Sequence, residues 1–214
     1  HGSSKGTEIT IIMVTKDNLS NSMTYQQYRE LIDRLVKEGR TSGNEQTEKL
    51  VNFTRLNLSR IRRWEKTFHP DPETVRSIEG LPGEEVWLII TETWCGDAAQ
   101  NIPVIEKLAS AANNIQTRYV LRDENLELMD AFLTNGARSI PKLIRIDATT
   151  QEVIGTWGPR PKVIHDKVID WKYNQKLDTE TYHELLHSWY FQDKGNEIQK
   201  EFRTFSQQTA SASC

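Results

Sequence analysis

The spacing of apolar residues along this chain changes near residue 80. Up to that point apolar positions recur every three or four residues, as on one face of an amphipathic helix. Thr24 has the chemistry of a helix start and Gly39 that of a helix stop. The elements expected in this part are an irregular segment over 1–22 with one possible strand at 9–14, helices over about 23–39 and 45–68, and a short helix ending near 78.

Beyond residue 80 short apolar runs alternate with helical patterns. Val86–Thr91 is a nearly continuous apolar run, which is typical of a strand buried on both faces. The pattern predicts an α/β domain in which two strands linked through a helix are parallel and the last two strands form an antiparallel hairpin. The expected elements are strands at 86–91, 115–121, 142–147 and 152–157, and helices at 96–112, 125–136 (stopped by Gly136), 161–175 and 179–206.

Composition narrows the classes of protein that fit. Hydrophobic residues make up 36% of the 214 residues and charged residues 27%, which indicates a globular chain. The net charge of −3 gives no reason to expect nucleic acid as a partner, and no apolar run approaches the roughly 20 residues of a membrane span. Two cysteines do not make a disulfide scaffold, and the N-terminus shows no secretory signal, so we expect a cytoplasmic protein. A signal removed before the first residue, His1, stays open, as does the oligomeric state.

Cys95 is expected at the turn from the first strand of this domain into its helix. A cysteine at a helix N-terminus faces unpaired backbone N–H groups and the positive end of the helix dipole, and both favour the thiolate. Asp97 places a negative charge in the same turn and opposes this effect. We expect the helix terminus to prevail and the pKa of Cys95 to lie below the free value of about 8.5.

Several motifs in this region resemble the thioredoxin family. Trp94-Cys95-Gly96 stands at the first strand-to-helix turn, Pro103 follows eight residues after the cysteine, and Ile140-Pro141 precedes the third strand, where the family has its cis-proline. The resemblance covers about residues 82–175 and implies a thioredoxin-like α/β fold, with a central mixed sheet flanked by helices. The stretches WCGDAAQNIP, LRDEN, TNGARSIPKLI and GTWGPRP more narrowly resemble bacterial thioredoxin-like proteins with a single active-site cysteine.

The resemblance divides the chain into four expected segments. These are an irregular N-terminal segment over 1–22, a helical extension over 23–80 outside the minimal fold, the thioredoxin-like domain with one extra C-terminal helix over 81–206, and a flexible tail over 207–214.

The departures from the family pattern concern the redox chemistry. Ala98 stands where a dithiol site has its second cysteine, and Asp97 replaces the family's proline. Ile89 occupies the place of a buried proton-accepting aspartate, and Lys142 replaces the threonine after the cis-proline. The chain therefore keeps the binding geometry of the family but lacks the groups that make a fast dithiol reductase.

The resemblance implies monothiol thiol–disulfide exchange with Cys95 as the nucleophile. The helix start Gly96, Asp97 and Ala98 would support the sulfur electrostatically, and Trp94 would lie at the rim of the site. Ser139, Ile140 and Pro141 would form a ledge that pairs with an extended substrate peptide. The expected partners are protein or small-molecule thiols and disulfides, with no cofactor and no metal.

One alternative function leaves Cys95 unreactive. The chain is then a non-catalytic module that binds a peptide or a partner on the same ledge, and it is not an enzyme. The reactivity of Cys95 separates the two functions.

The segment HELLH offers a more remote alternative. His183 and His187 lie one helical turn apart, as in zinc peptidases, with Glu184 in the place of the general base. Glu201 is a conceivable third ligand only if the chain turns near Gly195, because a straight helix would place it about 21 Å away. An amphipathic helix explains the same residues, and we prefer this interpretation.

Cys214, the last residue of the chain, ends a small and polar run. A tail of this length reaches at most roughly 30 Å, which is enough to cross much of one face of a domain. Cys214 is therefore a candidate for the thiol that resolves a mixed disulfide on Cys95.

Overall fold

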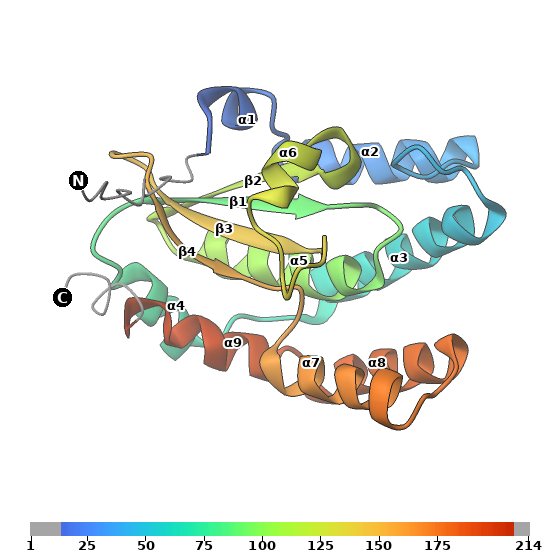
Figure 1. Cartoon of the computed structure of the whole chain (residues 1–214). Helices are drawn as coiled ribbons and strands as arrows, with labels where there is room; N and C mark the ends of the chain where they lie inside the picture. The colour runs from blue at the N-terminus through green and yellow to red at the C-terminus, as the bar shows by residue number, and fades with distance from the viewer. Residues whose placement is uncertain (1–13, 208–214) are drawn as a thin grey trace, which may run out of the picture.

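A mixed four-stranded sheet forms the centre of the computed structural model, which describes residues 14–207 (Figure 1). The strand order is β2-β1-β3-β4, in which β1 pairs in parallel with β2 and antiparallel with β3, and β3 pairs antiparallel with β4. The parallel pair, the hairpin and the α/β class predicted from the sequence are confirmed. The strands are β1 (Glu85–Thr91), β2 (Ile115–Leu121), β3 (Lys142–Asp147) and β4 (Val153–Trp157).

Four helices precede the sheet in the described chain. The hydroxyl of Thr24 accepts a hydrogen bond from the backbone N–H of Gln27 and caps α2, and Gly39 ends this helix with a φ of 65°, as the sequence predicted. A short helix lies within the segment predicted to be irregular, and most of the possible strand at 9–14 falls outside the described residues. These helices are α1 (Lys16–Ser20), α2 (Tyr25–Glu38), α3 (Glu48–Thr67) and α4 (Pro72–Glu79).

The helix α5 (Gly96–Ala111) follows β1 and is tied both to the sheet and to α3. Glu106 of α5 accepts hydrogen bonds from the hydroxyls of Thr117 and Tyr119 on β2. Tyr28 of α2 stacks on Tyr119 with ring centroids 5.4 Å apart, so α2 joins the same core at the edge of β2. In Figure 1, α1 and α6 lie above the sheet, and α3, α5 and the C-terminal helices lie below it.

Two helices differ from the sequence prediction. The helix expected over 125–136 is only five residues long, α6 (Leu126–Asp130), and Gly136 lies beyond it in a turn closed by hydrogen bonds between Thr134 and Ala137. The helix expected over 179–206 is broken into α8 (Thr179–Asp193) and α9 (Asn196–Arg203).

Gly195 explains the break between α8 and α9. It adopts a φ of 79°, and a Cβ at this position would lie 2.9 Å from the ring of Phe68. The chain bends here and continues into α9 (Figure 1), whose Phe202 contacts Trp87 in the core, with ring centroids 5.4 Å apart.

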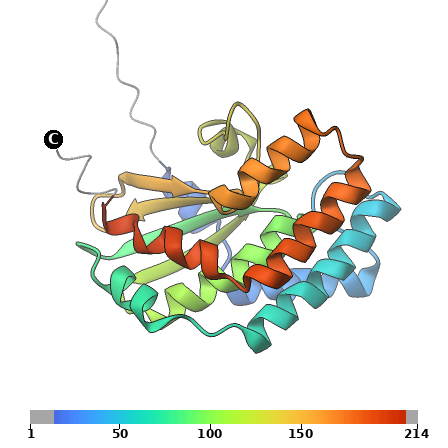
Figure 2. The same cartoon turned by 90° about the horizontal axis from the view of Figure 1, so that it is seen from below.

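A second, smaller hydrophobic cluster joins α8 to α7 (Lys162–Ile169), which continues into one π-helical turn (Asp170–Asn174). Figure 2 shows α7 and α8, in orange and orange-red, running side by side on the face seen from below. The buried members of this cluster are Ile164, Val168, Leu186 and Tyr190. The helix α8 therefore packs partly on a cluster separate from the main core.

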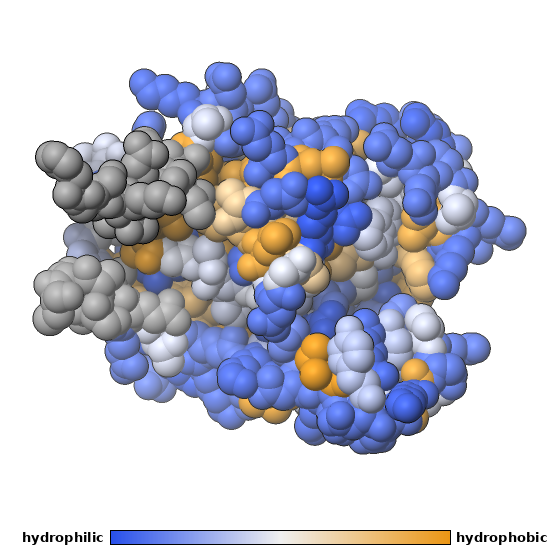
Figure 3. All heavy atoms as spheres, viewed as in Figure 1, coloured by the Kyte–Doolittle hydropathy of each residue, from blue (hydrophilic) through white to orange (hydrophobic). Residues whose placement is uncertain are grey.

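The surface drawn in Figure 3 is mostly hydrophilic, with small separate apolar areas. No helix within residues 14–207 combines the length and the apolar character needed to cross a membrane.

Candidate functional site around Cys95

Cys95 caps the N-terminus of α5. Its backbone is extended, and its sulfur accepts a hydrogen bond from the backbone N–H of Ala98 at 3.5 Å. The thiol in turn donates to the backbone carbonyl of Ile140, with 3.3 Å between sulfur and oxygen. The structure thus brings together the Trp-Cys-Gly motif and the loop before β3, which are 45 residues apart in the chain.

The loop at Ile140–Pro141, which contains the carbonyl that accepts from Cys95, is closely packed. The Ile140–Pro141 peptide bond is cis, and so is Gly158–Pro159 at the end of β4. Gly158 has a φ of 116°, and a Cβ there would lie 2.3 Å from the carbonyl oxygen of Pro141. Only glycine fits this contact, which holds the two loops against each other beside the thiol.

Asp97 lies in the first turn of α5 and is almost fully buried. The guanidinium of Arg160 donates to its carboxylate from Nε and Nη2, with a distance of 3.0 Å from Nε to Oδ1. The hydroxyl of Tyr190 on α8 donates to the same oxygen at 2.7 Å. The sequence analysis missed Arg160 and Tyr190, although a carboxylate on the buried side of a helix signals that a cation must lie nearby.

The pKa of Cys95 is raised to about 12. Burial is the main cause, because the side chain is only 8% exposed, and the charge of Asp97 acts in the same direction. The N–H of Ala98 and the guanidinium of Arg160 lower the pKa but do not compensate. The prediction of a pKa below 8.5 was therefore wrong, because it assumed a partly exposed sulfur at the helix end.

Cys95 lines a cavity of about 510 Å³. One wall consists of the β1–α5 turn with Trp94, Cys95, Gly96 and Asp97, and the opposite wall comes from α3, its preceding loop and α8. Trp94 is partly buried at this cavity, with the guanidinium of Arg122 above its ring at 5.1 Å. The residues of the opposite wall are Glu45, Thr47, Lys49, Leu50, Phe53, Arg60, His183, Leu186 and His187.

The HELLH segment therefore lies at the same cavity as the cysteine. Nδ1 of His187 is hydrogen-bonded to Nε2 of Gln100 at 3.0 Å, and the rings of His183 and His187 have centroids 6.4 Å apart. Glu184 is exposed. The segment lies on α8, as the amphipathic-helix interpretation expected.

The turn at Gly195 does not bring Glu201 to these histidines. Glu201 instead accepts hydrogen bonds from Nε1 of Trp157 and from the backbone N–H of Lys162, each at 2.6 Å. Among residues 14–207, no group of three His, Cys, Asp or Glu side chains is arranged to hold a metal ion.

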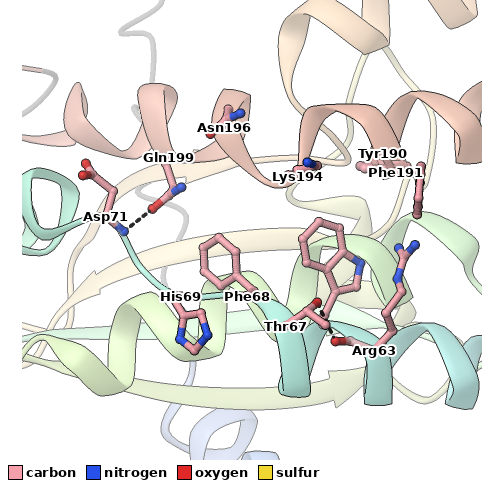
Figure 4. Close-up of a pocket in the computed structure, with 11 residues that line it drawn as sticks. Arg63, Thr67, Phe68, His69, Asp71, Tyr190, Phe191, Lys194, Asn196 and Gln199 are labelled. Atoms are coloured by element: carbon pink, nitrogen blue, oxygen red, sulfur yellow. Dashed lines mark hydrogen bonds between the residues drawn. The ribbon is translucent and has the colours of Figure 1, made fainter.

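A second cavity, of about 550 Å³, lies farther along α3, where this helix meets the end of α8 (Figure 4). The Arg63 guanidinium lies 5.2 Å from the ring of Trp64 and 5.6 Å from that of Phe191. Cys95 does not line this cavity, and its residues carry no arrangement of reactive groups comparable to the first.

The remaining predicted site residues have different outcomes. Ser139 is partly exposed next to the buried Ile140, and the carbonyl of Ile140 on the predicted ledge is occupied by the thiol. Ala98 is buried, 1% exposed, where a resolving cysteine would stand. Cys214 lies outside the described residues.

Comparison with known proteins places this geometry in a family. A family model described as Thioredoxin matches residues 43–172, which is more than half of the chain. The match begins before α3, so two of the helices expected to lie outside the family fold belong to the matched region, whereas α8 and α9 follow it. No curated protein matches the chain.

Two solved structures resemble the chain. A protein of unknown function from Pseudomonas aeruginosa is similar with a TM-score of 0.61 and 11% sequence identity, over 90% of this chain and 97% of that one. An HIV epitope scaffold is similar with a TM-score of 0.47 and 13% identity, over 86% of this chain and 97% of the other. At this identity the first similarity shows the fold alone.

Proposed function

Because the chain belongs to the thioredoxin family, we propose that it performs monothiol thiol–disulfide exchange on small molecules, with Cys95 as the nucleophile. The observation that carries the proposal is the position of the Cys95 sulfur, at the start of α5, against the Ile140 carbonyl and on the wall of a 510 Å³ cavity. Cavities of this size are typical of small-molecule sites. The proposal places the chain among single-cysteine relatives of thioredoxin, because Ala98 stands in the place of the second thiol.

The exchange involves one sulfur of the protein. The Cys95 thiolate attacks one sulfur of a disulfide R–S–S–R, the S–S bond breaks, and RS⁻ leaves and takes up the proton that Cys95 released. Cys95 ends as the mixed disulfide Cys95–S–S–R. A second small thiol attacks this disulfide, restores the Cys95 thiol and carries the other sulfur away as a new disulfide.

Burial makes this exchange slow in the structure as described. Because burial raises the pKa of Cys95 to about 12, only a very small fraction of the thiol is ionised at pH 7. The helix α8 forms part of the wall that covers the sulfur, so its movement would expose the thiol further to water. We infer that movement of α8 controls the rate.

The same pKa favours a second candidate function. A thiol that stays protonated is compatible with a non-catalytic module that binds a ligand or a partner without reacting with it. The cavity serves both functions, so the reactivity of Cys95 decides between them.

The test uses the full chain with Cys214→Ser, so that Cys95 is the one remaining thiol. Bis(2-hydroxyethyl) disulfide is added, and intact mass is recorded over time. We expect one adduct on Cys95, absent from the Cys95→Ser, Cys214→Ser control, which persists until a small thiol is added and then disappears. A chain that stays unmodified over hours at pH 8, while unfolded protein reacts, would favour the binding module.

A further inference from the structure

The wall of the Cys95 cavity that comes from α3 and α8 is rich in N–H donors and positive charge. Lys49 and Arg60 lie on it from α3, and His183 and His187 from α8. Glu45 is the one carboxylate on this wall, in the loop before α3. None of these side chains takes part in the exchange step itself, so their grouping around the sulfur needs a separate explanation.

The hydrogen bonds of Gln100 fix the tautomer of His187. Oε1 of Gln100 accepts from Nε1 of Trp64 at 2.7 Å and from Nη2 of Arg63 at 3.2 Å, and both of these nitrogens act only as donors. The amide nitrogen of Gln100 therefore faces His187 and donates to Nδ1 at 3.0 Å. A neutral His187 ring consequently carries its hydrogen on Nε2. Burial, followed by the charge of Arg60, lowers the pKa of His187 to about 4, so the ring is neutral at pH 7.

Arg60 is held in place by a neutral partner. Its Nη1 donates to Oδ1 of the buried Asn57 at 2.8 Å, and within residues 14–207 no carboxylate forms an ion pair with it. Burial, followed by the charge of Arg63, lowers the pKa of Arg60 to about 10, which leaves it protonated at neutral pH. Asp97, which is paired with Arg160, acts on Arg60 through its charge without forming an ion pair with it. A partly buried guanidinium that lacks an ion pair is one that an anionic ligand would stabilise.

Gly96 marks the point at which these donors meet. A Cβ on Gly96 would lie 3.0 Å from Nε2 of His187 and 3.5 Å from Nη1 of Arg60. Both nitrogens therefore lie close to the same side of Gly96, the residue that follows Cys95, and both residues line the Cys95 cavity. A carboxylate has two oxygens, so in this cavity it would accept a hydrogen bond from each nitrogen while a sulfur of the same molecule contacts Cys95.

We propose that this cavity selects small disulfides and thiols that carry a carboxylate, which Arg60 and His187 bind while the sulfur of the same ligand reaches Cys95. This proposal rests on the proposed exchange function and names its substrate class. Lys49, farther along α3, adds long-range attraction for the anion.

Three disulfides of similar size and different charge provide the test. They are 3,3′-dithiodipropionate with two carboxylates, bis(2-hydroxyethyl) disulfide without charge, and cystamine with two ammonium groups. The rate of mixed-disulfide formation on Cys95 is measured by intact mass in the Cys214→Ser chain at low and high salt. We expect the dianion to react about tenfold faster than the neutral disulfide and cystamine to react slowest, because a charge-assisted hydrogen bond is about twice as strong as a neutral one.

Arg60→Gln removes the charge while keeping polar N–H groups at the site. We expect it to abolish the preference for the dianion over the neutral disulfide. Arg62→Gln is the matched control, because Arg62 lies two residues away on α3, is exposed and pairs with Asp33 outside the cavity. Arg62→Gln should keep the preference for the dianion over the neutral disulfide.

The outcomes separate this proposal from the proposed function. Reaction with all three disulfides at equal rates, or a preference that survives Arg60→Gln, would overturn the anion site while exchange stands. If Cys95 reacts with none, calorimetric binding of 3,3′-dithiodipropionate to the Cys95→Ser, Cys214→Ser chain decides the anion site on its own. Binding that Arg60→Gln removes supports the site, and no binding at millimolar ligand overturns it.

Discussion

The two walls of the Cys95 cavity differ in how they are built and in what they offer a ligand. The wall at the start of α5 is held by buried, fully satisfied contacts, such as Asp97 with Arg160 and the thiol with the Ile140 carbonyl. The opposite wall offers Arg60, which lacks an ion pair in the described chain, and a histidine donor. The first wall holds the sulfur of Cys95 in position, and the second wall determines which ligands bind beside it.

The walls also differ in their mechanical support. Residues of β1 and α5 belong to the main hydrophobic core, whereas the buried apolar residues of α8, such as Leu186, belong to the small cluster. Two hydrogen bonds also tie α8 to α5, from Tyr190 to Asp97 and between His187 and Gln100. A helix packed on few buried residues opens locally at a lower free energy than the core unfolds. We therefore expect the same kind of substitution to change the accessibility of Cys95 by different amounts in the two walls.

The largest expected effect comes from removing one leucine from each wall. Leu108→Ala in the main core and Leu186→Ala on α8 each delete a buried side chain and should lower the free energy of unfolding by about 2–5 kcal/mol. Only Leu186→Ala should also raise the rate of Cys95 alkylation under native conditions, by about tenfold, because it loosens the wall that covers the sulfur. Denaturant unfolding and iodoacetamide labelling measure the two quantities. Equal labelling rates in both variants would show that α8 does not limit access.

Acid should weaken the α8 wall through His187. Its pKa falls to about 4 in the folded chain from the usual 6.5, so the neutral ring is favoured by folding. This contribution is present above pH 6.5 and is lost as the pH falls towards 4, with an upper limit of about 3 kcal/mol. The stability of His187→Gln should therefore decline less over this range than that of the parent chain.

The matched control for this acid effect is His69→Gln. His69 is exposed and does not line the Cys95 cavity, so His69→Gln shows what the loss of a histidine elsewhere in the chain does to the measurement. If the free energy of unfolding falls equally in the parent chain and in His187→Gln between pH 6.5 and 4, His187 is not the group that causes the loss of stability in acid.

The smallest expected effect concerns the first wall. Asp97→Asn removes a negative charge beside the sulfur and leaves that of Arg160, so the pKa of Cys95 should fall and alkylation at pH 8 should become about tenfold faster. Asp170→Asn, on the partly exposed turn after α7, removes the same charge away from the site and should leave the rate unchanged. A lower rate in Asp97→Asn would mean that Asp97 does not act on the sulfur through its charge.

The first wall could largely be predicted from the sequence. A strand, a Trp-Cys-Gly turn and a helix are local features, and the family resemblance supplied the contact between Cys95 and the loop at Ile140–Pro141. The second wall could not, because Arg60 and His187 lie far apart in the chain and meet only through the packing of α3 and α8. The sequence indicated HELLH as a possible zinc motif. Its position beside Cys95 could not be predicted, because it depends on the reversal of the chain between α7 and α8.

The predicted pKa of Cys95 was wrong for the same reason, because it depends on contacts between segments that are distant in the chain. The favourable effect of a helix N-terminus is local and can be predicted from sequence, whereas desolvation depends on what covers the sulfur. Here the cover comes from helices that the local pattern does not connect with the cysteine. The early end of α6 and the break at Gly195 also differ from the predicted helices; at Gly195 the positive φ and the contact with Phe68 explain the break.

The most direct test of the account is the state of Cys95 in protein recovered from cells. The Cys214→Ser chain is quenched in acid before and after an oxidative challenge, and its intact mass is compared with that of the Cys95→Ser, Cys214→Ser chain. The account predicts that a fraction of Cys95 carries a small thiol, with a mass increase that a 510 Å³ cavity accommodates and a reducing agent removes. Cys95 that stays unmodified in both states, or that is found only in disulfides with other proteins, would contradict it.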